Sequence, residues 1–296
     1  MTSAVRIGDY DARLLFRSAG IERYEASHVL LPRRVIIETI EPGAPRMTAV
    51  RLLRHAFILE LLSHPGVPRV FECGQHDGRP WVVIEDVEGP VLEREIAAQL
   101  LPVDEVLALI EAAASILVHA HARGVLHRDM TPAVIVRTPR HGFPLTLAGW
   151  FDATTTDTEL AKPLTGNSRY RAPELVHGLP IDPRVDIYAL GMIAWEALTG
   201  ELPSCAEHEA PQFVPPALAR LLDEMIDDAA VMRPSAAQVV ATVKQLRATL
   251  EADVRLDDYI AAIEHGRLRP RWTPQLGVDV TVTYDEEVIE LTRRRP

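Results

Sequence analysis

The side chains best suited to chemistry lie in one stretch of the chain, HAHARGVLHRD, which holds three histidines and an aspartate, Asp129. Imidazole and carboxylate groups are common ligands of divalent metals in proteins. Three further short motifs follow in order, and they are Arg171-Ala172-Pro173-Glu174, Asp186-Ile187-Tyr188-Ala189-Leu190-Gly191 and Met232-Arg233-Pro234. One H-R-D tripeptide carries little weight by itself, so the information lies in the order and spacing of all four motifs.

Together these motifs resemble the protein kinase family, and most nearly the bacterial Ser/Thr kinases. The resemblance extends from about Ile7 to Leu250. It implies that the histidine-rich stretch is the ordinary segment leading into a catalytic loop rather than a metal site. In this family a lysine, magnesium ligands and a glycine-rich loop hold ATP, while an aspartate accepts the proton of the substrate hydroxyl. The resemblance places Asp129 in the position of that aspartate.

Several positions that would contact the nucleotide depart from the family pattern. In RRVIIETI, Glu38 stands where the strand lysine is expected, and His55 stands where the family has the helix glutamate that pairs with this lysine. The charges are therefore exchanged, and we expect a Glu38–His55 contact. A unit charge pair at about 4 Å is worth about 4 kcal/mol at an effective dielectric constant of 20, so Glu38 would repel phosphate. The bulky Ile36 and the charged Arg23 replace the small and apolar residues that cover the adenine.

The positions that would bind magnesium have also changed. The catalytic-loop lysine is replaced by Thr131, and the metal-binding asparagine by Val134, whose side chain cannot coordinate a cation. The D-F-G motif aligns with Gly149-Trp150-Phe151, and a register one residue earlier gives Ala148-Gly149-Trp150. Neither register supplies a carboxylate, and Asp152 is the only acid nearby.

The stretch LLFRSAGIERYEA matches the glycine-rich loop of the family, but it keeps only Gly20. Phe16, Ser18 and Ile21 occupy glycine positions, where side chains obstruct the approach of backbone N–H groups to phosphates. We therefore expect negligible affinity for Mg-ATP and no phosphoryl transfer. Without its partners, Asp129 is expected to organise the loop through hydrogen bonds.

Other family features are retained. Glu174 and Arg233 match a buried ion pair of the large lobe, and Asp186 begins a buried helix. The segment between Phe151 and Arg171 corresponds to the activation segment. Its threonines are either targets of another kinase or ordinary turn residues, and they are Thr154, Thr155, Thr156, Thr158 and Thr165. Asn167 replaces the threonine that braces the catalytic loop.

The predicted fold is α+β, a bilobal kinase-like fold with a small β-rich N-lobe containing one helix and a larger helical C-lobe. We assign residues 1–85 to the N-lobe, 86–251 to the C-lobe and 252–296 to a C-terminal appendage. Strands are expected at 34–40, 67–73, 80–87 and 278–284, a hairpin at 133–136 and 145–148, helices at 48–63, 102–123, 183–200 and 235–250, and an extended linker at 269–274. In the first helix the recurrence of Val50, Leu53, Phe57 and Leu61 indicates the buried stripe.

Composition narrows the classes of function. The 296 residues carry 42 Asp and Glu against 31 Lys and Arg, a net charge of −11, which argues against binding nucleic acid or an anionic membrane. The beginning of the sequence lacks the apolar core of a signal peptide, and no apolar stretch approaches the roughly 18 residues of a membrane span. Two cysteines without CxxC spacing indicate neither a disulfide framework nor zinc. We expect a cytoplasmic chain.

Three functions remain open at this point. The first is a pseudokinase, a kinase fold without catalysis that binds a protein partner such as an active kinase or its substrate and needs no cofactor. The second is a divergent ATP-dependent Ser/Thr kinase or another nucleotide-using transferase, with Mg-ATP as its cofactor and Asp152, Glu38 or Asp129 as metal ligands. In the third, the kinase-like part carries the C-terminal appendage, whose strand pairs with a partner's sheet edge.

Overall fold

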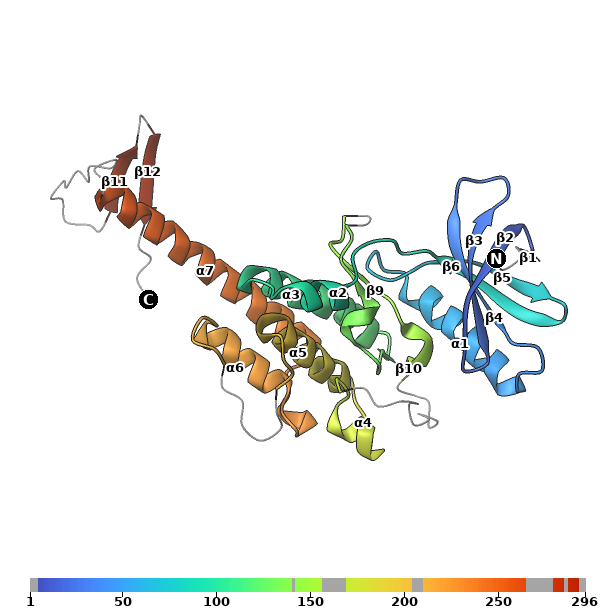
Figure 1. Cartoon of the computed structure of the whole chain (residues 1–296). Helices are drawn as coiled ribbons and strands as arrows, with labels where there is room; N and C mark the ends of the chain where they lie inside the picture. Colours follow the sequence, from blue (N-terminus) through green and yellow to red (C-terminus); the bar gives the residue numbers. More distant parts are fainter. Residues whose placement is uncertain are drawn as a thin grey trace. The chain divides into compact units, whose positions relative to one another are not determined.

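The computed structural model describes residues 5–139, 142–155, 169–203, 210–264, 279–284 and 287–292, and side chains as far as residue 250. The chain forms two compact units, Met1–Val243 and Lys244–Pro296. In the first unit, strands and one helix form one end, and helices dominate the other (Figure 1). This is the arrangement expected when short β-rich runs precede long helical ones.

The β-rich end is one antiparallel six-stranded sheet in the order β1-β2-β3-β4-β6-β5. Its strands are β1 (Val5–Ile7), β2 (Tyr10–Ser18), β3 (Ile21–His28), β4 (Arg34–Ile40), β5 (Val70–His76) and β6 (Arg79–Glu85). The strand predicted at 34–40 is confirmed, whereas β5 begins and ends three residues later than predicted. The pairing of β5 with β6 shifts register between Val70 and Glu72.

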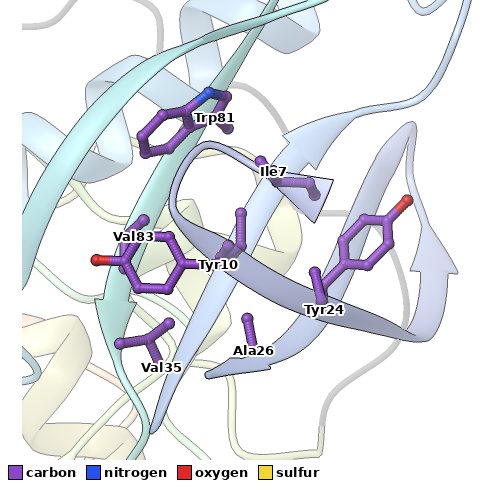
Figure 2. Packing of buried hydrophobic residues seen from close by; sticks show 9 residues of the cluster. Ile7, Tyr10, Tyr24, Ala26, Val35, Trp81 and Val83 are labelled. Atoms are coloured by element: carbon purple, nitrogen blue, oxygen red, sulfur yellow. The ribbon is translucent and has the colours of Figure 1, made fainter. Parts of the chain in front are cut away.

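Alternation along β4 gives the sheet two different faces. Val35 and Ile37 pack on one face into a cluster with aromatic residues of β2, β3 and β6, which Figure 2 shows. Ile36 and Glu38 belong to the other face, since successive side chains of a strand point to opposite sides. Both line a cleft on that side of the sheet. The cluster therefore fixes the strand that presents Glu38 to the cleft.

The segment compared above with a glycine-rich loop is a tight β-hairpin. β2 and β3 pair up to Ser18 and Ile21, and only Ala19 and Gly20 join them. Both joining residues have positive φ, 51° and 81°. Positive φ at both central residues is the geometry of a type I′ turn, which favours glycine at the second position. Phe16 lies on β2 beside this turn and is half exposed.

The helix α1 (Arg46–Leu62) forms where predicted, but the predicted buried stripe is wrong. Val50, Leu53, Phe57 and Leu61 are all exposed. The buried positions are Thr48, Leu52, His55, Ala56, Ile58, Leu59 and Leu62. The helix carries two apolar stripes, and the sheet covers the one that contains His55.

The helical end contains α2 (Leu92–Ala98), α3 (Val103–His121), α4 (Pro173–His177), α5 (Arg184–Thr199), α6 (Pro216–Met225) and the 3₁₀ turns η1 (Pro132–Val134), η2 (Trp150–Asp152) and η3 (Ala230–Met232). Short strands β7 (Val125–Leu126), β8 (Ile135–Val136), β9 (Thr146–Leu147) and β10 (Thr154–Thr155) lie between them. β8 pairs with β9, so the predicted hairpin is confirmed. α5 is buried along nearly its whole length, as predicted, and Gly200 caps it in the left-handed conformation.

The last helix, α7 (Ala236–Glu264), begins as predicted but is longer than predicted. Ser235 and Gln238 form a capping box, with Oε1 of Gln238 accepting from the Ser235 backbone N–H at 2.8 Å. The predicted end near residue 250 is wrong, because the helix continues to Glu264. The linker predicted at 269–274 lies outside the described residues.

The strand predicted at 278–284 is β11 (Asp279–Tyr284), and it pairs with β12 (Glu287–Thr292), a strand the sequence analysis did not predict. Among the described residues no helix combines the length and hydropathy that a membrane crossing requires.

Candidate functional site: a cleft with exchanged charges

A cleft of about 250 Å³ lies on the face of the sheet to which Ile36 and Glu38 belong. Residues from β3, β4, α1 and β6 line one side, and residues around η1 and η2 line the other. They include most of the positions singled out in the sequence, namely Arg23, Ile36, Glu38, His55, Leu59, Val134, Gly149, Trp150 and Phe151. Side chains that are far apart in the sequence thus meet in one place. Thr131 is not among the lining residues and lies at the start of η1.

Glu38 is the centre of a buried network of charged and polar groups. Its Oε2 lies 3.1 Å from Nδ1 of His55, so the predicted contact forms, and its Oε1 lies 3.4 Å from Nη1 of Arg23. The Glu38 side chain is only 6% exposed. Burial opposes ionisation, but the hydrogen bond with His55 and the charges of His55 and Arg23 outweigh burial and lower the pKa of Glu38. The cleft therefore holds a buried carboxylate whose charge is satisfied by His55 and Arg23.

Val134 and Gly149 lie against each other where they line the cleft. Gly149 has φ of +77°, and a Cβ built on it would lie 2.6 Å from Cγ1 of Val134 and 3.0 Å from its Cβ. A side chain at residue 149 therefore collides with residue 134 unless one of them moves. The two positions are complementary in shape, because one has no side chain and the other is apolar. No oxygen ligand for a cation comes from either side chain.

Asp152, three residues after Gly149 in the sequence, is paired with an arginine of α1. Its Oδ1 accepts a hydrogen bond from Nη2 of Arg51 on α1 at 2.7 Å. The Arg51 guanidinium also lies over the ring of Phe151, 4.9 Å from its centroid, and His55 packs edge-on against the same ring at 5.5 Å. Next to it, Arg54 donates to Oγ1 of Thr154 at 2.6 Å. These contacts hold α1 against the segment that follows Gly149.

Asp129 is paired with a residue that the sequence analysis did not single out for this role. Arg171 donates from Nε at 3.2 Å and from Nη2 at 2.9 Å to the same carboxylate oxygen, Oδ1. The side chain of Arg171 is 9% exposed and that of Asp129 is 31% exposed. An arginine that donates twice to one oxygen fixes the orientation of the carboxylate and occupies that oxygen. The two residues are far apart along the chain, so local sequence offers no signal for their pairing.

The histidines of the stretch 119–127 serve the fold. His121 Nε2 lies 2.8 Å from Oδ2 of Asp186, and that carboxylate also accepts the backbone N–H groups of His127 at 2.9 Å and Arg128 at 2.7 Å. Burial opposes ionisation of Asp186, but the contact with His121 and these hydrogen bonds lower its pKa. His127 Nε2 lies 2.7 Å from the carbonyl oxygen of Ala148. Across the described residues, no group of three or more His, Cys, Asp or Glu is placed to hold a metal ion.

The ion pair predicted between Glu174 and Arg233 is confirmed. Arg233 donates to both carboxylate oxygens of Glu174, at 2.6 and 2.9 Å, and both residues are buried. The same guanidinium lies over the ring of Tyr188 at 4.8 Å. This pair connects α4 to the turn before α7 and so fixes the helical end of the unit.

Comparisons with known proteins show to which family the chain belongs. Residues 45–243 match the family described as protein kinase domain. The chain is 30% identical over 259 residues to the serine/threonine-protein kinase PknI of Mycobacterium tuberculosis, covering 86% of this chain and 40% of that protein. It is 27% identical over 299 residues to Pkn1 of Myxococcus xanthus, covering 93% of this chain and 41% of that protein.

The crystal structure of the M. tuberculosis PknI kinase domain superposes with a TM-score of 0.63 at 28% identity, covering 83% of this chain and 99% of that one. The predicted bilobal fold, with a β-rich N-lobe and a helical C-lobe, is thereby confirmed. The chain spans about 40% of the length of the curated relatives it matches.

Proposed function

Since this chain belongs to the protein kinase family, we propose that it is a pseudokinase, a member that keeps the fold and has lost phosphoryl transfer. The observation that carries the proposal is the set of side chains at the positions where phosphate and magnesium would bind. Glu38 is neutralised by His55 and Arg23 where phosphate would need a cation. Val134 abuts Gly149 where magnesium would need oxygen ligands.

The residues present do not fit Mg-ATP. Magnesium takes oxygen ligands in octahedral geometry, usually one or two carboxylates together with substrate phosphates. Neither Val134 nor Gly149 has a side-chain oxygen, and Asp152 is held by Arg51. The phosphates would meet a paired carboxylate in place of a lysine. Replacing a cation by an anion about 4 Å from phosphate changes the interaction by roughly twice 4 kcal/mol as an upper bound, at an effective dielectric constant of 20.

We propose that the chain acts by binding a protein, such as an active kinase or its substrate, as a regulatory or scaffolding module. The contacts within the fold support this role, because the Glu174–Arg233 pair and the Asp186 hydrogen bonds, which hold the helical end together, are all made within the chain. Fold alone does not determine function, so the identity of the partner rests on experiment. We propose a cytoplasmic site of action.

A divergent ATP-dependent Ser/Thr kinase is the second candidate. Two observations favour it. The relatives above are named serine/threonine-protein kinases, and Asp129 stands in the H-R-D motif shortly before Ala133 and Val134, which line the cleft of about 250 Å³. For this candidate, Asp129 would accept the proton of the substrate hydroxyl while Arg171 donates to its Oδ1. A metal would have to be held by Asp152, Glu38 or Asp129 in an arrangement that differs from the family pattern.

One experiment separates the two. The purified chain is incubated with labelled ATP, Mg²⁺ or Mn²⁺ and a general acceptor protein, in parallel with an Asp129→Ala variant. We expect equal background labelling from both. Labelling by the unaltered chain above that of the variant would establish the second candidate and remove the first.

Nucleotide binding is measured separately by thermal unfolding with and without Mg-ATP. A ligand present at 100 times its dissociation constant stabilises the folded state by about 2.7 kcal/mol. We expect no stabilisation of the unaltered chain. The matched comparison is the fourfold variant Glu38→Lys, His55→Glu, Val134→Asn, Gly149→Asp, which returns the family residues to the cleft. Stabilisation of this variant alone would show that these positions cause the loss of binding.

A further inference from the structure

α1 presents an apolar face to solvent. Five large apolar side chains on it are exposed, and they are Met47 (51%), Val50 (49%), Leu53 (48%), Phe57 (63%) and Leu61 (37%). Their spacing of three or four residues places them along one side of the helix. They form a stripe, here called the outer stripe, about 21 Å long at 1.5 Å per residue. Proteins that act alone rarely expose a continuous apolar surface of this kind.

The contacts of α1 explain why this stripe remains exposed to solvent. The opposite side of the helix packs on the sheet through residues such as Leu52, Leu59 and Leu62, which are almost fully buried. Arg51 and Arg54 hold its flank to Asp152 and Thr154. The helix therefore cannot turn to bury the outer stripe without breaking these contacts. The stripe is a fixed feature of the folded unit.

The charges at the two ends of the outer stripe indicate what covers it. Arg46 and Glu60 are the only charged residues of α1 in the fully exposed class, and within the described part of the chain neither forms an ion pair. Positions 46, 50, 53, 57 and 60 alternate in steps of four and three, the spacing of a helix–helix seam. Arg46 and Glu60 each lie seven residues from Leu53, on opposite sides of it.

We propose that the outer stripe is the contact surface for a second copy of this chain, with the two α1 helices antiparallel and Leu53 at the two-fold axis. A two-fold contact requires a self-complementary surface. In the antiparallel arrangement Arg46 of each copy meets Glu60 of the other, and apolar residues meet in between. A parallel arrangement would place Arg46 against Arg46 and Glu60 against Glu60, so the charges select the antiparallel one.

Self-association is measured by sedimentation velocity over a concentration series in about 150 mM salt, which limits long-range repulsion between two chains of net charge −11. We expect a monomer–dimer equilibrium. Leu53→Glu places two carboxylates at the axis and should abolish the dimer. The matched control is Leu30→Glu, an 86% exposed leucine outside α1, which should leave the equilibrium unchanged.

A charge exchange tests the antiparallel register. Arg46→Glu alone and Glu60→Arg alone each create two like-charge contacts per dimer, so each should associate about tenfold more weakly than the unaltered chain. An equimolar mixture of the two variants restores both contacts, because position 46 of each chain then faces the opposite charge at position 60 of the other. The mixture should associate as tightly as the unaltered chain. Both residues are exposed, and unchanged thermal unfolding would show that the variants fold.

Three outcomes would overturn the proposal. The chain could remain monomeric at all concentrations, the dimer could tolerate Leu53→Glu, or the mixture could associate no better than the single variants. If instead a different protein is shown to cover the outer stripe while the chain alone is monomeric, the surface serves that protein. None of these measurements uses nucleotide, so their results are independent of the proposed lack of phosphoryl transfer.

Discussion

Glu38 and His55 form a buried pair, and the structure shows why each residue needs the other. A carboxylate that is 6% exposed needs partners, because burial of an unpaired charge destabilises a fold by several kcal/mol. His55 supplies one partner at 3.1 Å and Arg23 supplies another at 3.4 Å. Arg23 belongs to the same network, because it lies opposite Glu38 in the pairing of β3 with β4.

This coupling gives the first prediction. Glu38→Lys alone places a cation beside Arg23 and His55 and should lower the free energy of unfolding by about 3 to 5 kcal/mol. Adding His55→Glu supplies an anion and should recover at least about 1 kcal/mol of that loss. Urea unfolding of the two single variants and the double variant measures the coupling. The exposed pair Arg6–Asp9 is the control, where Asp9→Lys should change stability by less than about 1 kcal/mol. Simple additivity of the two substitutions in the cleft would contradict the prediction.

The second prediction concerns the fit between Gly149 and Val134. Gly149→Ala should destabilise the fold by about 1 to 3 kcal/mol more than Gly43→Ala does. Gly43 has nearly the same φ, +79° against +77°, and open space around it, so it isolates the backbone contribution. Val134→Ala should remove most of the extra loss, because it deletes the colliding methyl groups. Equal effects of the two glycine substitutions in urea unfolding would show that the collision does not occur.

At the scale of residues, motif alignment predicted which positions meet in the cleft, including the Glu38–His55 contact. It could not predict the pairing of Asp129 with Arg171. The motif spacing identifies both residues, but their contact depends on the path of the chain between them. Ion pairs formed across such distances are consequences of tertiary structure, which periodicity and spacing do not report.

Among the elements, α1 shows the limit of periodicity most clearly. Its sequence contains two apolar stripes, one with Leu52, Ala56 and Leu59 and one with Val50, Leu53 and Phe57. Both have helical spacing, so the pattern predicts the helix correctly but does not say which stripe faces the sheet. The strands β2 and β3 were not predicted for a similar reason. Charged residues on one face of these strands interrupt their apolar residues, so no continuous apolar run marks them.

The turn between α1 and β5 gives the third prediction. His64 accepts a hydrogen bond at Nδ1 from the Gly66 backbone N–H at 3.0 Å, which requires a neutral ring. Burial, with the nearby charges of His119 and Arg123, lowers the pKa of His64 from 6.5 to about 4. Between these values the unfolded chain binds a proton at His64 and the folded chain does not. This residue therefore lowers stability progressively as pH falls from about 7 to 4.

We expect His64→Asn to remove this contribution, because asparagine can accept the same hydrogen bond and does not titrate. The difference in unfolding free energy between the variant and the unaltered chain should shift in favour of the variant by up to about 3 kcal/mol from pH 7 to pH 4. Urea unfolding at several pH values measures it, with the difference at pH 8 as baseline, where histidine is neutral in both states. A difference that does not change with pH would contradict the prediction.

For the whole molecule, the family motifs predicted the helical lobe best, because they lie in the contacts that hold this lobe together. The Glu174–Arg233 pair and the Asp186 hydrogen bonds are examples. The C-terminal region carries no such motif. Its helix was predicted to end near residue 250 and continues to Glu264, and β12 was not predicted. The sequence around residue 250 lacks a glycine or proline that would signal the end of a helix.

The fourth prediction tests the proposed boundary of the appendage. Ala236, Val239 and Val243 of α7 are buried, and all three lie in the first compact unit. Deleting residues 252–296 keeps these side chains and should change the unfolding free energy of that unit by no more than about 0.5 kcal/mol. A control deletion of residues 236–296 removes them and should cost several kcal/mol. If the shorter deletion destabilises the unit as much as the control does, the appendage is an integral part of its core.

The register shift between Val70 and Glu72 has a consequence for how copies of this molecule can meet. β5 is an edge strand of the sheet, and an edge offers unpaired backbone groups on which the strand of another chain can add. A bulge bends such an edge and interrupts its ladder, and the exposed Glu72 adds a charge there. This edge of the sheet is therefore protected from open-ended, amyloid-type growth, which agrees with the closed, two-fold helical contact proposed above.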